Sequence, residues 1–306
     1  MTPDESYRVC TLCPRSCAVD RTDKRGFCGA DDTPEVAKIM LHHWEEPPIS
    51  GTDPERGSGA IFFSHCSLGC AFCQNRKISR REGTGQRMTA GELADAMRKL
   101  EADGAYNINL VSPTHYTPTL MEAVRIARAA GLRLPIVWNT GGYERPETIR
   151  QLDGTVDIYL TDFKYASSDL ALRYSGAADY PETAMASLEE MLRQIGACVF
   201  DEGGMMRRGV IVRHLVLPGC AADSITVLRQ IAGRIPVNSI RLSLMAQYTP
   251  DFLPEPTDGT ADPYRSIRRK ITTYEYDKVA DEADRLGFDG WMQERSSATS
   301  RFTPDF

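Results

Sequence analysis

Three cysteines with the spacing CxxxCxxC, Cys66, Cys70 and Cys73, are the residues of this sequence best suited to chemistry. They follow the apolar run 60–63, which predicts a short buried strand that ends where the cysteine loop begins. A [4Fe-4S] cluster usually takes four thiolates, so three from one loop would leave one iron open to a further ligand. The alternative is a zinc site whose fourth ligand is His65 or a distant residue.

A second group of cysteines lies near the N-terminus and consists of Cys10, Cys13, Cys17 and Cys28. Four cysteines in a short, turn-rich stretch make a nearly complete tetrahedral ligand set. We therefore predict a second metal site that holds either zinc or an auxiliary [4Fe-4S] cluster, with a structural role favoured over electron transfer. Disulfides are the less favoured alternative, because the chain is expected to be cytoplasmic.

The two remaining cysteines are weaker candidates. Cys220 follows a Pro-Gly pair at the end of a predicted strand, where it could donate a hydrogen atom or bind a substrate metal. An ordinary loop residue is the simpler interpretation. Cys198 has apolar neighbours and is expected in the core.

Strands alternate with helices from residue 60 onward, and this alternation must position the cysteine loop. Such spacing predicts right-handed βαβ units and a parallel sheet. The predicted fold class is therefore α/β, a partial (β/α)6 barrel. Thr89 and Glu92 form a capping-box pattern at the first helix. The expected strands are 60–63, 106–111, 135–138, 156–160, 209–217 and 239–245, with a terminal strand around Trp291, and the expected helices are 89–103, 117–130, 146–152, 181–195, 223–231 and 271–286.

The segment before the barrel predicts a separate small lobe. We expect residues 1–57 to form a cysteine-rich metal-binding lobe and its connector, and residues 58–306 to form the barrel. The stretch 31–57 is rich in proline, glycine and acidic residues, so we expect a packed connector with Trp44 as its anchor. The adjacent His42 and His43 would point to opposite faces of an extended segment, which disfavours joint metal binding.

Polar or special residues follow each expected strand of the barrel. Because ligands of parallel α/β sheets bind beyond the carboxyl ends of the strands, we expect these residues to meet at one mouth. They are the Cys66 loop, Ser112 to His115, Asn139 to Gly142, Asp162 with Lys164, Pro218 with Gly219, and Gln247 with Tyr248.

The composition is that of a folded, mildly acidic protein. Hydrophobic residues make up 42% and charged residues 25% of the 306 residues, and the net charge is −6. We therefore expect no sequence-independent binding of nucleic acid, although the stretch 76–87 is a candidate basic patch. The first residues lack the features of a secretory signal and no apolar run is long enough to span a bilayer, so we expect a cytoplasmic protein without membrane contact.

Several motifs in order resemble a known family. GluGluProProIleSerGly, GlySerGlyAlaIlePhePheSer before CxxxCxΦC with aromatic Phe72, AsnLeuValSerProThrHis, AspPheLys and ArgHisLeuValLeuProGly occur between about Cys10 and Tyr248. This pattern resembles the radical S-adenosylmethionine (radical SAM) superfamily, and within it the PflX-type branch, whose members are similar to pyruvate formate-lyase activating enzymes. The resemblance implies a cluster on the three cysteines of the loop, to whose open iron S-adenosylmethionine binds, beside Phe72.

The resemblance also implies roles for residues at the strand ends. Asp162, Lys164 and Thr140 match positions that hold the cofactor and a nearby monovalent cation, and Asn139 stands where an aspartate is usual. Arg213 matches an arginine that contacts the cofactor. Two departures concern the cofactor's pose. Ser112 begins the sequence that replaces the usual GlyGlyGlu motif, so recognition of the amino group falls to hydroxyl or backbone oxygens, and Tyr248 falls near the place of a ribose-binding histidine.

These inferences lead to an enzyme that reductively cleaves S-adenosylmethionine to a 5'-deoxyadenosyl radical for hydrogen abstraction. The resemblance implies a glycyl-radical enzyme as protein substrate and a low-potential electron donor such as flavodoxin or ferredoxin. A small molecule or another protein side chain is an equally open substrate class. The alternative from a different class is a non-catalytic iron-sulfur sensor or scaffold, which would form no deoxyadenosine.

Overall fold

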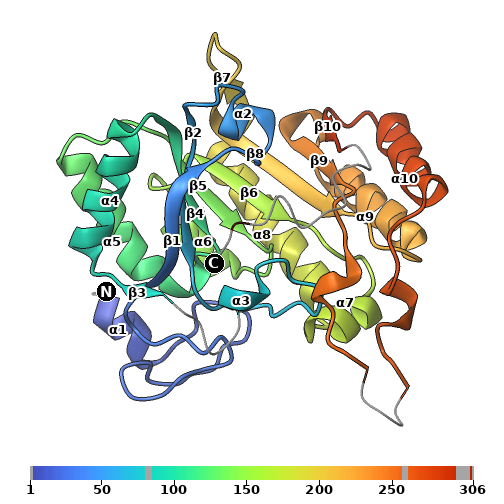
Figure 1. Ribbon diagram of the computed structural model, residues 1–306, viewed down its shortest axis with the longest axis horizontal. Coiled ribbons are helices and arrows are strands. Elements are labelled where there is room, and N and C mark those ends of the chain that lie inside the picture. The colour runs from blue at the N-terminus through green and yellow to red at the C-terminus, as the bar shows by residue number, and fades with distance from the viewer. Residues whose placement is uncertain (1–2, 80–84, 257–260, 294–303, 305–306) are drawn as a thin grey trace.

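In the computed structural model of the chain, one curved sheet carries helices on its outer face and a small N-terminal lobe at one end (Figure 1). The structure describes residues 3–79, 85–256, 261–293 and 304. Within these residues the sheet has the strand order β10-β9-β8-β6-β5-β4-β2-β1-β3, with β7 paired to β8. Neighbouring strands from β2 to β10 pair in parallel along this order, whereas β1 pairs antiparallel with both β2 and β3.

The predicted α/β fold with a mostly parallel sheet is confirmed. Every strand expected from the alternation is present, including the terminal strand around Trp291. Each of the three central strands is buried at all but one position, as expected for strands covered on both faces. The strands are β1 (Glu35–His42), β2 (Gly57–Phe63), β3 (Gln86–Arg87), β4 (Ala105–Val111), β5 (Ile136–Thr140), β6 (Ile158–Asp162), β7 (Val199–Phe200), β8 (Met206–Leu215), β9 (Arg241–Met245) and β10 (Gly290–Met292).

The long helices cover the outer face of the sheet, on which their apolar stripes pack into one large core. The capping box predicted at Thr89 and Glu92 is present at the start of α4. A second capping box, between Thr272 and Glu275, begins α10. The helices are α1 (Pro3–Arg8), α2 (Pro47–Ser50), α3 (Arg76–Ser79), α4 (Ala90–Ala102), α5 (Thr117–Ala129), α6 (Pro146–Gln151), α7 (Ser168–Ser175), α8 (Tyr180–Ile195), α9 (Ala221–Arg234) and α10 (Thr273–Leu286).

The segment expected as a connector contains a strand, and this corrects the prediction. β1 pairs with β2 over Val36 to His42 and extends the same sheet. Trp44 does not anchor this segment in the core, because 61% of its surface is exposed. Helix α7 was also missed, although Ser167 caps it by accepting a hydrogen bond from the amide of Leu170.

The two ends of the barrel differ. Helix α2 lies where the parallel strands begin, and α3 and the N-terminal lobe lie where they end (Figure 1). Ile49 of α2 is fully buried in a cluster with strand residues Val137, Ile158 and Leu160. This apolar contact fills the inner face near the start of the strands, so open space remains toward their carboxyl ends.

Two sequence-based expectations concern surfaces. Among the described helices, none combines the length and apolar character that crossing a bilayer requires. Of the candidate basic patch at 76–87, residues 80–84 lie outside the described residues. Among the remaining residues, Arg87 forms an ion pair of 2.5 Å with Asp31, and Arg76 donates to the carbonyl of Phe252. Part of the positive charge of the patch therefore stabilises the fold.

Candidate functional site

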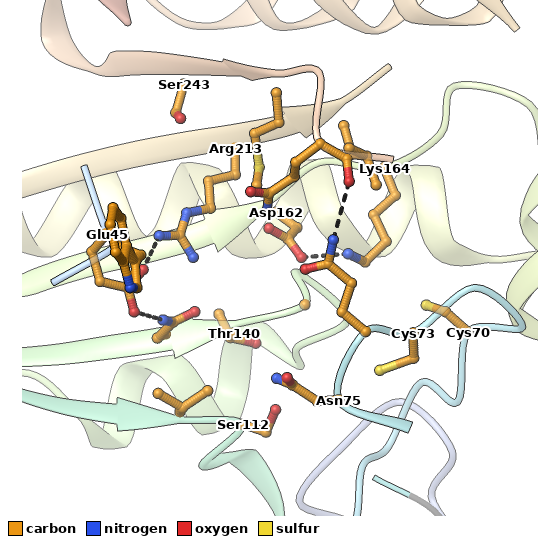
Figure 2. Close-up of a pocket in the computed structure, with 18 of the residues that line it drawn as sticks. Glu45, Cys70, Cys73, Asn75, Ser112, Thr140, Asp162, Lys164, Arg213 and Ser243 are labelled. Carbon is orange, nitrogen blue, oxygen red and sulfur yellow. Dashed lines mark hydrogen bonds and ion pairs between the residues drawn. The ribbon is translucent and has the colours of Figure 1, made fainter. Parts of the chain in front are cut away.

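A cavity of about 480 Å³ lies on the inner face of the sheet, between the strand ends and the loop after β1. Figure 2 shows the cysteine loop on one side and Glu45 on the other, with side chains from the central strands between them. Of the expected strand-end groups, only the pair at 218–219 contributes nothing to the wall. The predicted site residues that line the cavity are Cys66, Cys70, Phe72, Cys73, Ser112, Asn139, Thr140, Asp162, Lys164 and Arg213.

The cysteine loop is held so that its thiols face this cavity. Cys70 is buried, whereas Cys66 and Cys73 are partly buried. The hydroxyl of Ser175 on α7 donates to Cys70 Sγ over 3.1 Å, and the hydroxyl of Ser79 on α3 donates to Cys73 Sγ over 3.4 Å. Such donors stabilise a thiolate more than a thiol. These two hydrogen bonds therefore favour the thiolate, the form of sulfur that binds metals.

Burial acts against ionisation of these thiols. It raises the pKa of Cys70 to about 11 and also raises the pKa of Cys73, while the nearby Lys164 charge opposes part of both shifts. A metal centre would therefore displace protons as it binds. Three thiols on one cavity wall suit an iron-sulfur cluster as a donor set. In the described part of the chain no group of three His, Cys, Asp or Glu side chains stands in metal-binding geometry, so both cysteine metal sites stay predictions.

Asp162 and Lys164 place opposite charges next to the thiols. Asp162 ends β6, and the Lys164 ammonium forms an ion pair with its carboxylate. Burial alone would lower the pKa of Lys164, but Asp162 and Cys70 raise it, so the side chain is charged at neutral pH. The hydroxyl of Tyr180 accepts from the Lys164 amide over 2.9 Å and donates to the carbonyl of Gly141 over 2.9 Å. This tyrosine thus fixes two strand-end loops relative to each other.

Glu144 is a buried acid that the sequence analysis did not identify. It is 1% exposed, and its Oε1 accepts hydrogen bonds from the hydroxyls of Thr140 and, over 2.5 Å, Thr114. Because both hydroxyls donate to the acid, their lone pairs remain available to accept from a ligand. Ser112, one residue beyond β4, has left-handed backbone with φ 57°, a conformation that costs a non-glycine residue energy. The sequence that replaces GlyGlyGlu is thus closely constrained.

Replacement of Glu144 by glutamine should flatten the pH dependence of stability. Burial raises the pKa of Glu144 to about 7 from an ordinary 4.5, so the folded protein binds this proton more tightly than the unfolded chain. The stabilisation is complete below pH 4.5 and is lost as the pH rises through 7, which lowers the free energy of unfolding by up to about 3 kcal/mol. Urea unfolding at pH 5 and pH 8 should show this loss in the wild type and not in Glu144→Gln. Glu189→Gln on α8 is the control. The prediction would be contradicted if the free energy of unfolding changed equally between pH 5 and pH 8 in all three proteins.

Arg213 lies on the inner face of β8, where it pairs with two adjacent carboxylates. Its Nε donates to Glu46 Oε1 over 2.7 Å, and its Nη2 donates to Glu46 Oε2 over 2.6 Å and also to Glu45. Asn139 Nδ2 donates to Glu45 Oε1 over 3.4 Å. Burial alone would raise the pKa of Glu45, but Arg213 and His42 lower it, so the carboxylate is charged.

The N-terminal cysteines gather around a buried arginine. Cys10, Cys13 and Cys28 are buried and Cys17 is partly buried. Burial raises the pKa of Cys13 to about 12 and also raises that of Cys28, although the positive charge of Arg21 lowers the latter. Arg21 is 1% exposed and donates to Cys10 Sγ over 3.8 Å. A buried cation beside thiols suits a site that binds them as thiolates.

Arg15, between two cysteines of this lobe, contacts the loop of the other cysteine group. It donates to the carbonyls of Ser67 over 3.1 Å and Leu68 over 3.2 Å. It also donates to the carbonyls of Ser175 over 3.0 Å and Gly176 over 2.5 Å, at the end of α7. One guanidinium therefore ties the lobe to the loop of Cys66 and to the helix that supplies the hydrogen bond to Cys70.

Removal of this arginine should weaken retention of the cluster. In Arg15→Ala four carbonyls lose a charged donor, each worth about 1–3 kcal/mol where water does not replace it. Because the contact is partly exposed, we expect iron loss to a chelator to become about tenfold faster rather than immediate. Stopped-flow absorbance of reconstituted protein would measure this rate. Arg25→Ala, in the same lobe but away from the loop, is the control, and equal rates in both variants would contradict the role of Arg15.

Three residues named from the sequence point away from the cavity. His65 is not among the residues that line the cavity, and its Nε2 lies 3.2 Å from a carboxylate oxygen of Glu35. Among the described residues it forms no metal-binding group with the thiols, so the zinc alternative gains no support. His214 faces opposite to Arg213, and its Nδ1 lies 2.6 Å from the carbonyl of Phe163. The Tyr248 hydroxyl donates to a backbone carbonyl and does not reach the cavity, which corrects its expected place near a ribose.

Neither isolated cysteine belongs to the cavity. Cys198 is partly buried, and its thiol lies 3.6 Å from the carbonyl of Ser239. This agrees with its expected place at the core. Cys220 is buried at the start of α9 and is absent from the cavity wall, so a role there as hydrogen-atom donor has no support.

Two of the acids that sequence reasoning missed have a partner that is distant in sequence. Glu45 and Glu46 lie 168 and 167 residues from Arg213. Glu144 follows the Gly-Gly pair after β5 and could have been singled out as a strand-end acid. For Glu45 and Glu46 the available signal was an acidic pair next to an apolar ProProIle segment, which is unusual for a solvent-exposed connector.

Part of the chain matches a known family model. The model of the radical SAM superfamily matches residues 60–206, from β2 to the beginning of β8. A protein of Methanocaldococcus jannaschii, named "Uncharacterized protein MJ0674", is 27% identical over 291 residues, which cover 92% of this chain and 76% of that protein. The matched region includes the three-cysteine loop and the strand-end residues through Lys164.

Solved structures share the fold at low sequence identity. A radical SAM methyltransferase from Sphaerobacter thermophilus is 16% identical, with a TM-score of 0.50, over 79% of this chain and 67% of that chain. HydG, a maturase of the [FeFe]-hydrogenase, is 12% identical, with a TM-score of 0.51, over 80% of this chain and 53% of that chain. These similarities concern the arrangement of the strands and helices.

Proposed function

We propose that this chain cleaves S-adenosylmethionine reductively for hydrogen abstraction. The family match and the shared fold support this proposal, because both support membership of the radical SAM superfamily. The observation that carries the proposal is that β2 delivers three thiols into the same cavity as the Asp162–Lys164 pair. A structural metal site needs no such cavity or charged pair.

The residues of the chain would then have distinct roles. Cys66, Cys70 and Cys73 would hold a [4Fe-4S] cluster, which when bound supplies one electron for cleavage of the cofactor to a 5'-deoxyadenosyl radical. Lys164 presents a charged donor that suits the carboxylate of the cofactor, and Asp162 offers an oxygen to its amino group or to a monovalent cation.

The wall of the cavity supports this role. Ser112 and Thr140 offer oxygens near the thiols, while the Phe72 ring packs edge-on against Tyr174 and Tyr248 beside them. These ring contacts make this part of the wall apolar and well packed. An apolar wall favours exclusion of water, which would protect a reactive species there from side reactions.

Product analysis under strict exclusion of oxygen tests the proposal. Protein reconstituted with iron and sulfide, reduced with dithionite and given S-adenosylmethionine should form 5'-deoxyadenosine and methionine in equal amounts. Chromatography with mass detection would quantify both. If a fully loaded cluster forms neither product with this reductant, the enzyme proposal fails, and the alternative of an iron-sulfur sensor or scaffold takes its place.

The activation of a glycyl-radical enzyme is a narrower proposal, and the PflX-type resemblance motivates it. Trp44 and Met292 line the cavity and are 61% and 47% exposed, so an apolar rim is available to a protein loop. Electron paramagnetic resonance after incubation with candidate lyases and a flavodoxin or ferredoxin donor would detect a glycyl radical. A small-molecule substrate is the competing proposal, and the two buried glutamates Glu45 and Glu46 favour it.

The N-terminal metal can be assigned by a difference measurement. We propose that Cys10, Cys13, Cys17 and Cys28 hold zinc or an auxiliary [4Fe-4S] cluster in a small lobe over residues 1–57. Iron and zinc content of the wild type and of a variant that lacks all three cysteines of the 66–73 loop separates these alternatives. Zinc that persists in the variant assigns a zinc site, and residual iron assigns a second cluster.

A further inference from the structure

Two adjacent glutamates, Glu45 and Glu46, line the cavity, and Glu45 lies on the side opposite the cysteine loop (Figure 2). We name them the acidic pair. Their side chains are only 7% and 6% exposed. The proposed cofactor site lies at the thiol side and uses neither of them. The proposed cleavage of the cofactor therefore assigns no function to the acidic pair.

The acidic pair is held rigidly in place. The Ser50 hydroxyl donates to the carbonyl of Glu45 over 3.0 Å, and the Ile49 amide donates to the carbonyl of Glu46 over 2.8 Å. Asn109 Nδ2 donates to Glu45 Oε1 over 2.9 Å. Both carboxylates are thus fixed before any ligand arrives, which is a property of binding sites rather than of mobile surface acids.

The charges on the cavity wall do not balance. Asp162 and Lys164 neutralise each other, but the acidic pair shares one guanidinium, that of Arg213. Among permanently charged groups, one negative charge is therefore left over where little water is available, and such a charge is costly unless a cation joins it. The permanently charged side chains among the described residues of the wall are Glu45, Glu46 and Asp162 on the acidic side and Lys164 and Arg213 on the basic side. His42 also lines the wall, with Nδ1 3.6 Å from Glu45 Oε1, and it adds a positive charge only when its ring is protonated.

Unused polar atoms lie next to the acidic pair. His42 is 6% exposed, and neither of its ring nitrogens has a hydrogen-bond partner among the described residues, although Nδ1 lies 3.6 Å from Glu45 Oε1. Asn109 Oδ1 is likewise buried without a partner. A ring nitrogen without a proton can accept a hydrogen bond. Of these two residues, His42 lines the cavity. The site therefore offers carboxylate oxygens, an imidazole and surplus negative charge, and the ligand that matches them is a positively charged hydrogen-bond donor.

We propose that the substrate is a small molecule with an ammonium or guanidinium group, which binds to the acidic pair while the rest of the molecule extends toward the cysteine loop. This inference rests on the proposed function and names its substrate class. A small molecule fits better than a protein loop, because α2 closes this side of the cavity with the fully buried Ile49. Arg213 then acts as the fixed counter-ion that keeps the two carboxylates together.

Binding of named probes tests this inference separately from turnover. Full-length protein with reconstituted cluster and S-adenosylmethionine would be titrated anaerobically with agmatine, cadaverine and, as the neutral analogue, 1,5-pentanediol. We expect both cations to bind at least roughly tenfold more tightly than the diol, the scale of one charge-assisted hydrogen bond. Glu45→Gln and Glu46→Gln should each remove this preference, because either change leaves the remaining glutamate neutralised by Arg213.

A double variant distinguishes charge from structure. Glu45→Gln with Arg213→Gln leaves Glu46 without its counter-ion and restores one surplus negative charge, so the preference for cations should return. Glu189→Gln, an exposed acid on α8, should bind the probes like the wild type. Circular dichroism would establish that each variant is folded. If Glu45→Gln does not fold, Glu46→Gln tests the same prediction.

Three results would overturn the inference: equal binding of cations and diol by the wild type, no binding of either, or undiminished cation binding by both single variants. Failure of the proposed function would look different, because the wild type would then form no 5'-deoxyadenosine whatever it binds. Deoxyadenosine formation without a preference for cations would remove only the acidic pair as a substrate site.

Discussion

Alanine at Cys66, Cys70 or Cys73 should abolish formation of 5'-deoxyadenosine. Each thiol faces the same cavity, and no other cysteine among the described residues lines it. A cluster with only two protein ligands would be lost or could no longer present one open iron. We expect the rate to fall by at least roughly 10³-fold, the scale on which removal of a member of a catalytic unit acts.

The measurement needs a control for the general effect of removing a thiol. Cys198→Ala is suitable, because this cysteine is partly buried beside Val210 and Ser239 and does not reach the cavity. It should retain iron content and product formation near the wild-type level. Deoxyadenosine formed at a normal rate by any of the three loop variants would show that the loop does not hold the reactive cluster.

Methionine at Lys164 should weaken the binding of S-adenosylmethionine by roughly 100-fold, the upper range for one charge-assisted contact in a buried place. Lys164 is charged, only 16% of its side chain is exposed, and its partner Asp162 lies in the same wall. Without the ammonium, the cofactor's carboxylate would meet an unpaired Asp162, so repulsion adds to the lost attraction.

Equilibrium dialysis of the cluster-loaded protein with labelled cofactor would measure this affinity. Lys99→Met is the matched control, because the Lys99 side chain is 78% exposed on α4 and pairs with Asp103 on the surface. The cluster itself should stay intact in Lys164→Met, with unchanged iron content. An affinity equal to that of the wild type would place the cofactor's carboxylate elsewhere in the cavity.

The parallel part of the fold was predictable because its signals are local. Apolar strand runs and the Thr89–Glu92 capping box each lie within a few residues, and the strand runs identified β2, β4, β5, β6, β8, β9 and β10 in order. The two-residue strands β3 and β7 were missed. β1 was missed because buried and exposed residues do not alternate along it. It also lies outside the parallel part of the sheet, because it pairs antiparallel with β2 near one edge. The Pro- and Gly-rich sequence around it resembles a loop, and only its partner β2 makes it a strand.

The same distinction applies to the site. Ser112, Asn139, Thr140, Asp162 and Lys164 could be placed at one mouth because parallel strands carry their ends to one edge. The partners of these residues could not be placed, because contacts such as that between Glu144 and Thr114 depend on side chains from different strand-end loops. Geometry of this kind comes from packing of the whole sheet rather than from any pattern along the chain.

The contacts of Arg15 have a consequence for how the protein opens. One side chain bridges the N-terminal lobe, the turn after Cys66 and the last residues of α7, segments up to 161 residues apart. These segments should therefore exchange their amide hydrogens with solvent at similar rates, as a single cooperative unit. In Arg15→Ala we expect the amides of the turn after Cys66 to exchange faster, while the amides of β4 and β5 keep their protection. Local opening of this region would then be independent of opening of the sheet.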